Sequence, residues 1–301
     1  MTEEIVDALK IKSDGIYVDC TLGGGGHSRK IGERLDERGL IIGIDRDLDA
    51  IDAATENLRG LKCKVEIVHE NFSELEKVLD TLDIKKVDGI IFDLGVSSHQ
   101  IDTAERGFSY MKDAPLDMRM DRTKKFSAYE VINGYDEDSL KKIFREYGEE
   151  KFSGRIATKI IDARKISPIK TTGELVKIIE SVTPKISSGG HPAKRIFQAV
   201  RIEVNGELKI LSDAIKTAIG RLKIGGRIAV ITFHSLEDRI VKTTFNDLAR
   251  DCICPKNFPR CICNHLAEIK ILGKTNTAEP EEIEINSRAK SAKFRAAEKI
   301  L

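Results

Sequence analysis

The chain has 301 residues, 41% of them hydrophobic, and its formal net charge is +1 at pH 7. These values fit one large or two moderate globular domains and exclude a uniformly basic nucleic-acid coat protein. No apolar run reaches membrane-spanning length, and the acidic start Met1-Thr2-Glu3-Glu4 carries no signal-peptide pattern, so six cysteines favour the reducing cytoplasm over a disulfide framework.

The first predicted elements surround a run of four glycines. After a short amphipathic helix over 2–12, a buried strand over 16–20 leads into Gly23–Gly26, a helix is expected over 27–38, and a second buried strand over 40–44 ends on Asp45. This order begins a doubly wound α/β sheet. Because a carboxylate at the tip of the second strand can accept hydrogen bonds from both ribose hydroxyls, the sequence predicts a nucleoside site here.

The glycine run distinguishes two kinds of nucleoside cofactor. No Gly-x-Gly-x-x-Gly frame fits, because the sixth position counted from the first two glycines is Ser28 or Arg29. A dinucleotide-dependent dehydrogenase is therefore disfavoured, whereas Asp19 in the first strand, the loose glycine loop and Asp45 suit S-adenosylmethionine. A glycine turn without a ligand is the remaining interpretation, although four consecutive glycines cost conformational entropy that structure alone rarely requires.

Two further strands are predicted before the pattern changes. A helix over 49–58 precedes a third strand over 65–68, and Phe72 beyond it has two interpretations, a ring packed on adenine or an ordinary core residue. A helix over 73–82 leads to a fourth strand, 87–93, that ends on Asp93. Because ligands bind beyond the carboxyl ends of such strands, Asp93, Ser97 and Ser98 are expected at the mouth of the site, with a capping aspartate as the alternative.

The α/β order stops near residue 103. Segment 104–121 is predicted to be a polar loop, and helices are expected over 128–133, 137–146, 151–164 and 172–182. The sheet domain would then consist of 1–102 and 201–301, with 103–200 inserted as a helical domain. Residues 151–201 hold eleven Lys or Arg and three Asp or Glu, an excess that suits a partner with phosphates but also an ordinary solvated helical face.

The sheet is expected to resume in the last third of the chain. A long helix from 191 through 222, a strand over 225–235 and a helix over 236–247 are predicted, and strand-like pieces over 267–272 and 292–298 would form a closing antiparallel hairpin. The fifth strand ends on His234 and Ser235. His234 either lines an acceptor pocket or is a hydrogen-bonded structural histidine.

The motifs together carry a resemblance to one family. In chain order they are Asp19-Cys-Thr-Leu-Gly-Gly-Gly-Gly-His-Ser, Gly43-Ile-Asp-Arg-Asp, Asp93-Leu-Gly-Val-Ser-Ser, Glu105-Arg-Gly-Phe-Ser, Pro115-Leu-Asp-Met-Arg-Met-Asp, Tyr147-Gly-Glu-Glu, Phe197-Gln-Ala-Val-Arg-Ile, Phe233-His-Ser-Leu-Glu-Asp-Arg and Asn286-Ser-Arg-Ala-Lys-Ser. Over nearly its whole length the chain closely resembles the bacterial 16S ribosomal RNA cytosine-N4 methyltransferases of the RsmH (MraW) family. It lacks the short His- and Pro-Val-containing segment with which the family usually begins, and Ser287 and Lys290 replace the usual Pro and Arg of the last motif.

This resemblance implies a class I S-adenosylmethionine-dependent methyltransferase, with a Rossmann-like, doubly wound, seven-stranded sheet. Residues 1–102 and 201–301 would form the methyltransferase domain, and 103–200 the substrate-recognition domain. The implied reaction is methylation of the exocyclic N4 of a decoding-centre (P-site) cytosine in 16S rRNA of the small ribosomal subunit, and a homodimer is left open. The residues carried over as cofactor contacts are Gly25, Gly26, His27, Asp45, Phe72, Asp93 and Gln100, of which Gln100 rests on the resemblance alone.

The implied acceptor is a weak nucleophile, because the lone pair of cytosine N4 is conjugated with the ring. Amino methyltransferases generally end the fourth strand on an acid or Asn followed by Pro-Pro-aromatic; here Asp93-Leu-Gly-Val-Ser lacks those prolines. Asp93 is therefore a candidate for N4 activation or for cofactor contact, and no general base is assigned. The base must be unstacked and supported by basic side chains, for which we expect Arg106, Arg119, Lys194, Arg195 and Arg201.

Four cysteines form a paired Cys-x-Cys pattern, Cys252 with Cys254 and Cys261 with Cys263. Four thiolates could close a tetrahedral zinc site, but a spacing of one residue is tighter than usual. A reduced, proline-containing loop is the alternative, so no metal ligand is assigned. At the level of function, a non-catalytic RNA-binding assembly factor on the same scaffold is the competing hypothesis; the intact glycine run, Asp45 and Asp93 favour the enzyme.

Overall fold

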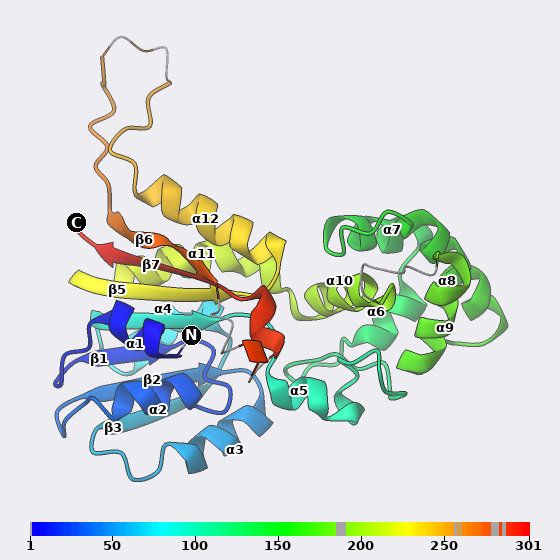
Figure 1. The fold of residues 1–301 in the computed structure, drawn as a ribbon, viewed down its shortest axis with the longest axis horizontal. Coiled ribbons are helices and arrows are strands. Elements are labelled where there is room, and N and C mark those ends of the chain that lie inside the picture. Colours follow the sequence, from blue (N-terminus) through cyan, green and yellow to red (C-terminus); the bar gives the residue numbers. More distant parts are fainter. Residues whose placement is uncertain (1, 185–190, 256–257, 259, 278–282, 285–286) are drawn as a thin grey trace. The chain divides into compact units, whose positions relative to one another are not determined.

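A computed structural model describes residues 2–184, 191–255, 258, 260–277, 283–284 and 287–301 (Figure 1). The chain divides into two compact units: Met1–Gly95 with Leu208–Leu301, called here the sheet unit, and Val96–Glu207, called the helical unit. The sequence predicts domain boundaries after residues 102 and 200, whereas in the structure the chain divides after Gly95 and after Glu207. Asn286, which begins the last motif, lies outside the described residues.

The sheet unit contains one seven-stranded sheet with the strand order β3-β2-β1-β4-β5-β7-β6 (Figure 1). The first five strands pair in parallel, and β7 runs antiparallel to both β5 and β6. The strands are β1 Ile16–Asp19, β2 Leu40–Asp45, β3 Lys64–His69, β4 Val87–Asp93, β5 Leu222–Thr232, β6 Ile269–Thr277 and β7 Lys293–Lys299. The predicted fold class, a doubly wound sheet closed by an antiparallel hairpin, is confirmed.

Helices cover both faces of this sheet, which is why its parallel strands read as nearly continuous apolar runs. Val18 of β1 packs in one cluster with side chains of α4, α11 and α12, whereas its neighbour Tyr17 packs with side chains of α1 and α2. Ala54 and Leu58 at the end of α3 form a smaller cluster with Leu22. The helices are α1 Thr2–Leu9, α2 Gly26–Gly32, α3 Leu48–Asn57, α4 Leu75–Thr81, α11 Glu207–Arg221 and α12 Ser235–Leu248, with short 3-10 helices at Phe72–Glu74 and Ser287–Ser291.

The helical unit has a hydrophobic core of its own, to which Phe144, Ile156 and Ile179 contribute fully buried side chains. Side-chain caps fix where several of its helices begin: Ser127 and Thr171 form capping boxes with the glutamate three residues later, as the sequence pattern S/T-x-x-E favours. Its helices are α5 Ser98–Asp102, α6 Ala128–Gly134, α7 Glu137–Glu146, α8 Ser153–Ile166, α9 Thr172–Val182 and α10 Ala193–Asn205, with a 3-10 turn at Ala104–Arg106.

Two predicted helices were too long. The helix expected to run from 191 through 222 is broken at Gly206, whose left-handed backbone (φ 63°) caps α10 before α11 begins. The helix expected over 27–38 ends at Gly32. Farther on, Asp36 accepts the backbone N–H of Arg38 at 2.8 Å, a local turn that competes with helix continuation.

The segment predicted to be a polar loop, 104–121, is instead part of the helical unit's core. Leu116, Met118 and Met120 are buried there. Arg106 is only 1% exposed, and its guanidinium donates to the backbone carbonyls of Arg119 and Met120 at 3.0 and 3.1 Å. Beyond its short 3-10 turn the segment has no helix or strand to pair its backbone groups, so the buried guanidinium supplies the donors that these two carbonyls need.

Gly107 in this segment provides a test of the packing. Its φ is 69°, and a Cβ there would collide with the carbonyl oxygen of Pro115 and lie 2.9 Å from the backbone N of Asp117. We expect Gly107→Ala to lower the free energy of unfolding by about 2–4 kcal/mol in denaturant titrations. Gly134→Ala, at the end of α6 with open space around it, is the matched control and should stay within about 1 kcal/mol of the wild type; equal losses in the two variants would contradict the collision.

None of the helices in the described ranges combines the length and the apolar character needed to cross a membrane.

Candidate functional site

Three carboxylates end adjacent strands of the sheet unit. Asp19 ends β1, Asp45 ends β2 and Asp93 ends β4, and β1 pairs in parallel with both of the other strands. Parallel neighbours bring their carboxyl ends to the same edge of a sheet, where ligands of such folds bind. This carboxyl edge therefore gathers the acids that the sequence pattern singled out.

The glycine run forms the loop above this edge. Gly23 (φ 51°) donates its N–H to Asp45 at 2.7 Å, and the second oxygen of that carboxylate accepts the N–H of Asp47 at 2.9 Å. Gly25 (φ 76°) is the N-cap of α2, and a Cβ there would lie 3.3 Å from the side chains of Ala54 and Leu58. Asp45 thus has its orientation fixed by two backbone donors while each of its oxygens keeps lone-pair capacity for a further donor.

Open space borders the same loop. Built Cβ atoms at Gly24 and Gly26 would meet nothing within 4 Å. Asn57 on α3 donates to the carbonyl of Gly24 at 2.9 Å and so ties the loop to the neighbouring helix. A ligand can therefore approach the backbone of a loop that is held from behind.

His27, on the first turn of α2, lies between two of the acids. Its Nε2 is 3.3 Å from Oδ2 of Asp93, and the nearby Asp19 accepts a hydrogen bond from Ser28 Oγ at 2.8 Å. Among the described residues, His27 Nδ1 and Asp93 Oδ1 are buried and no hydrogen-bond partner reaches either atom. Buried polar atoms are rarely left unsatisfied, so these two point to a polar ligand at this edge.

The electrostatics follow from burial. Burial raises the pKa of Asp19 to about 6, against the charge of His27 and the hydrogen bonds of Ser28 and Thr21. Burial also raises the pKa of Asp45, although the N–H groups of Asp47 and Gly23 oppose it. Burial alone would lower the pKa of His27, but its hydrogen bond to Asp93 and the two carboxylate charges outweigh it and raise that pKa. The edge therefore favours a ligand that carries positive charge.

The Asp19 shift predicts a pH effect on stability. The folded protein binds this proton more tightly than the unfolded chain, so the charged carboxylate lowers stability as pH rises from about 4 through about 6. Asp19→Asn lacks this titration and keeps both hydrogen-bonding positions. We expect its free energy of unfolding relative to wild type to rise by about 3 kcal/mol between acidic and neutral pH in denaturant titrations; a difference that is independent of pH would contradict the assignment.

Two predicted site residues, Phe72 and His234, make contacts that stabilise the fold. Phe72 is 8% exposed, and its ring packs edge-on against Phe92 with centroids 5.7 Å apart, so a contact with adenine would involve only the small exposed part of the ring. His234 is the N-cap of α12 and forms a capping box with Glu237, whose carboxylate accepts the N–H of Phe233 at 2.8 Å. These contacts favour the structural interpretation of His234.

The remaining predicted residues belong to the helical unit. Gln100 is the third helical residue of a capping box with Ser97: its side-chain oxygen accepts the N–H of Ser97, and its own N–H donates to Ser97 Oγ, both at 3.1 Å. This contact fixes the start of α5. Ser97-x-x-Gln100 is a capping-box pattern that could have been recognised in the sequence.

The five arginines and lysines predicted to bind RNA differ in exposure. Arg106 is buried, Arg119 forms a two-bond pair with Asp117 at 2.6 and 2.8 Å, and Arg201 forms one with Glu207 at 3.0 Å for both bonds. Lys194 and Arg195 lie exposed on the first turn of α10. Buried and bidentate guanidinium groups support the fold, so Lys194 and Arg195 are the two of the five best placed for a phosphate.

Two hydroxyl groups at the carboxyl edge were not predicted from the sequence. Thr21 Oγ1 accepts the backbone N–H of Asp93 at 2.6 Å and so links the loop after β1 to the end of β4. Ser28 holds the Asp19 carboxylate. A threonine before a glycine run carries no specific signal for the first contact, whereas the polar Ser28 on an otherwise buried helix face was a signal for the second.

Comparisons with known proteins identify the family of the chain. The family model described as the MraW methylase family matches residues 1–300. The protein named "Ribosomal RNA small subunit methyltransferase H" of Clostridium botulinum (strain Loch Maree / Type A3) is 57% identical over 303 residues, which is 100% of this chain and 97% of that protein. The protein of the same name from Clostridioides difficile (strain 630) is 52% identical with the same coverage.

Among solved structures, an rRNA methylase from Streptococcus thermophilus aligns with a TM-score of 0.43 and 10% identity, over 100% of this chain and 94% of that chain.

Proposed function

This chain belongs to the MraW methylase family, and we propose that it transfers a methyl group from S-adenosylmethionine to the exocyclic N4 of a decoding-centre (P-site) cytosine in 16S rRNA. The names of relatives 57% and 52% identical support rRNA of the small subunit as substrate, and the resemblance of the motifs supports cytosine N4. The observation on which the proposal depends is the carboxyl edge, where a glycine loop meets Asp45, His27 and Asp93.

S-adenosylmethionine fits the residues at this edge. Asp45 would accept hydrogen bonds from the ribose hydroxyls with the lone pairs that Gly23 and Asp47 leave free. At Gly26, where a Cβ would meet nothing within 4 Å, the missing side chain would let the cofactor approach the backbone, whereas at Gly25 it lets the loop pack against Ala54 and Leu58. The buried, unsatisfied Nδ1 of His27 would gain a polar partner, and the surrounding carboxylates suit a sulfonium.

S-adenosylmethionine supplies, when bound, an electrophilic methyl group on a positively charged sulfur. The chain must then hold the acceptor nitrogen in line and keep its lone pair available. Asp93 Oδ1 is an acceptor without a partner in the described structure, and accepting an N4 hydrogen would favour the pyramidal, attacking form of the amine. His27, 3.3 Å from the other oxygen, orients this carboxylate. The proton lost after methylation can leave to water.

The experiment that tests the proposal identifies the methylated nucleoside. Small ribosomal subunits lacking the modification, and free 16S rRNA, are incubated with the protein and methyl-labelled S-adenosylmethionine, and the RNA is digested to nucleosides. We expect the label in N4-methylcytidine from one site. Label in another nucleoside, or none from folded protein that binds S-adenosylmethionine, would contradict the proposal; the second result would favour a non-catalytic assembly factor.

Asp93→Asn tests the role of this carboxylate in the same assay. If Asp93 activates N4, the rate constant should fall on the order of 100-fold while the Kd for S-adenosylmethionine changes little. A raised Kd with an unchanged rate constant at saturation would assign Asp93 to cofactor contact instead. Asp52→Asn, exposed on α3, is the control and should behave as wild type.

The helical unit is proposed to bind the RNA. Its residues 151–201 hold eleven Lys or Arg against three Asp or Glu. Lys151, two residues before α8, and Arg155 and Lys159 on α8 are all exposed. Lys194 and Arg195 on α10 add two more exposed charges. Such charges bind phosphates without regard to sequence and therefore contribute affinity more than base selection.

A further inference from the structure

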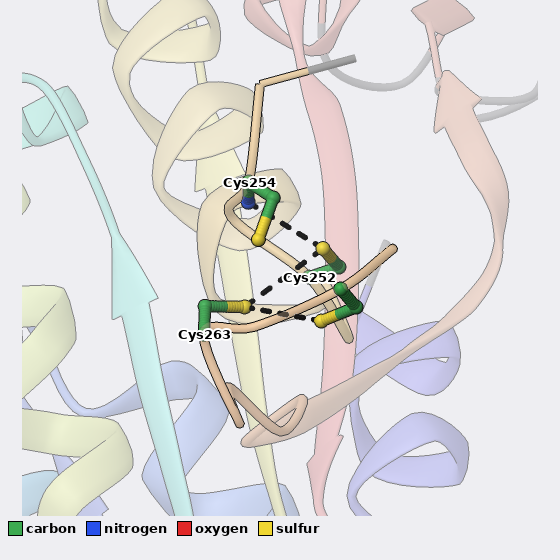
Figure 2. A group of neighbouring side chains, drawn as sticks. Cys252, Cys254 and Cys263 are labelled. Atoms are coloured by element: carbon green, nitrogen blue, oxygen red, sulfur yellow. Dashed lines mark hydrogen bonds between the residues drawn. The ribbon is translucent and has the colours of Figure 1, made fainter. Parts of the chain in front are cut away.

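The loop between α12 and β6 brings together four cysteines that the methyltransferase site does not use. The N–H of Glu268 donates to the carbonyl of Leu248 at 2.8 Å and closes the base of the loop. Within it, the sulfur atoms lie within 4.8 Å of one another (Figure 2). The four residues are Cys252, Cys254, Cys261 and Cys263.

We propose that these four thiolates bind one zinc ion. Zn–S bonds of about 2.3 Å in a tetrahedral site place the sulfurs about 3.8 Å apart. The distance from Cys263 Sγ to Cys252 Sγ is 3.8 Å, and that to Cys261 Sγ is 3.5 Å. Two of the six sulfur separations therefore lie close to the value for a single tetrahedral ion, and the others are no longer than 4.8 Å.

Other uses of four cysteines fit the geometry less well. A cluster of two or four irons would spread the four sulfurs farther apart, because they are divided among several irons and do not all bind one ion. A disulfide needs a sulfur separation of about 2.05 Å, and all four cysteines are free at the distances observed. Tetrahedral coordination by four sulfurs is typical of zinc.

The loop has little else to hold it together. Ile253, Ile262 and Leu266 are 61%, 69% and 60% exposed. In the described part of 250–266, no side chain belongs to a hydrophobic cluster of the sheet unit. Small segments that lack a core are commonly stabilised by a metal whose binding free energy supplies their folding free energy. The N–H of Cys254, which points to Cys252 Sγ at 3.4 Å, would help to stabilise a thiolate there.

The zinc site would be structural. Four protein ligands close the coordination shell and leave no position for a substrate. Its place in the sheet agrees: Ile269 of β6 pairs with Lys299 of β7, whereas the carboxyl end of β5, Thr232, pairs with Lys293. The cysteine loop therefore joins the sheet at the edge opposite to the one that carries Asp45 and Asp93.

Metal analysis of the full-length protein tests this proposal. Protein purified under reducing conditions, reconstituted with zinc sulfate and dialysed, should contain one zinc per chain by mass spectrometry. The double variant Cys261→Ser/Cys263→Ser should lose it, and competition with a chromophoric chelator should show binding weaker on the order of 1,000-fold. Cys63→Ala, a buried cysteine outside the loop, is the control and should keep the full zinc content.

Limited proteolysis provides a second readout that does not depend on the variants. Trypsin should cleave the wild-type protein after Arg260, an exposed residue of the loop, at least about 10-fold faster once a chelator has removed the metal. Binding of S-adenosylhomocysteine should be unchanged and confirms that the sheet unit is intact. A zinc content equal in wild type and double variant, stoichiometric iron in place of zinc, or cleavage that is insensitive to the chelator would each overturn the proposal.

Discussion

Asp45→Ala should bind S-adenosylmethionine on the order of 100-fold more weakly than the wild type in titration calorimetry. Hydrogen bonds to a charged group contribute about 1.5–3 kcal/mol each, and two ribose hydroxyls would lose their acceptor together. The substitution also releases the N–H of Gly23, which Asp45 accepts at 2.7 Å, so the loop loses its anchor. Asp45→Asn keeps one acceptor oxygen and should lie between the two.

The matched control is Asp49→Ala, which removes an exposed carboxylate four residues away on α3. Its affinity should be that of the wild type, which separates the loss of a contact from the loss of a nearby charge. Circular dichroism should show both variants folded. Wild-type affinity in folded Asp45→Ala would show that this carboxylate does not hold the cofactor.

Lys194→Glu/Arg195→Glu should lose RNA binding, weakening it on the order of 100-fold or more at moderate salt, while the affinity for S-adenosylmethionine stays nearly intact. Each lost phosphate contact lowers the slope of log affinity against log salt by about 1, and the new carboxylates repel the backbone. Filter binding of labelled 16S rRNA fragments across a salt series measures both quantities.

Lys62→Glu/Lys64→Glu makes the same change in net charge at two exposed residues of the sheet unit and serves as the control. It should retain most of the RNA affinity if the helical unit makes the contacts. Equal losses of RNA affinity in the two double variants would show that the loss comes from the change in net charge and not from contacts of Lys194 and Arg195. A parallel loss of cofactor affinity in the α10 variant would refute its assignment to RNA.

The sheet and its acids could be predicted because both depend on local pattern. Buried parallel strands appear in the sequence as short apolar runs. Two of the predicted strands end on Asp45 and Asp93, and the first contains Asp19; the topology places all three at one edge. The four glycines mark the loop directly, since Gly23 and Gly25 have positive φ. The order in which the strands pair brings these residues together, and that order cannot be seen in the sequence pattern.

What could not be predicted depends on contacts between distant residues. From the sequence Arg106 would be expected to be an exposed cation, but it is buried and donates to backbone carbonyls thirteen and fourteen residues later. Arg201 would also be expected to be a free cation, but in the structure it forms an ion pair with Glu207. The burial of Phe72 could not be predicted without knowing that its ring packs against that of Phe92. The break at Gly206 was within reach, because glycine at a helix end commonly takes the left-handed conformation.

The cysteine loop illustrates the same division. The one-residue spacing of Cys252 with Cys254 and Cys261 with Cys263 argues against zinc when ligand spacing is judged alone. In the structure a hydrogen bond between Glu268 and Leu248 closes the base of the loop, and the two pairs of sulfurs lie together within it. Ligand geometry, rather than spacing, carries the inference.

A crystal structure of the protein with S-adenosylhomocysteine tests the central claim most directly. The ribose hydroxyls should donate to Asp45, the glycine loop should contact the ligand through its backbone, and His27 Nδ1 and Asp93 Oδ1 should each gain a hydrogen-bond partner from the ligand or from water ordered by it. A ligand bound away from the carboxyl edge, or one whose ribose lies out of reach of Asp45, would contradict the account.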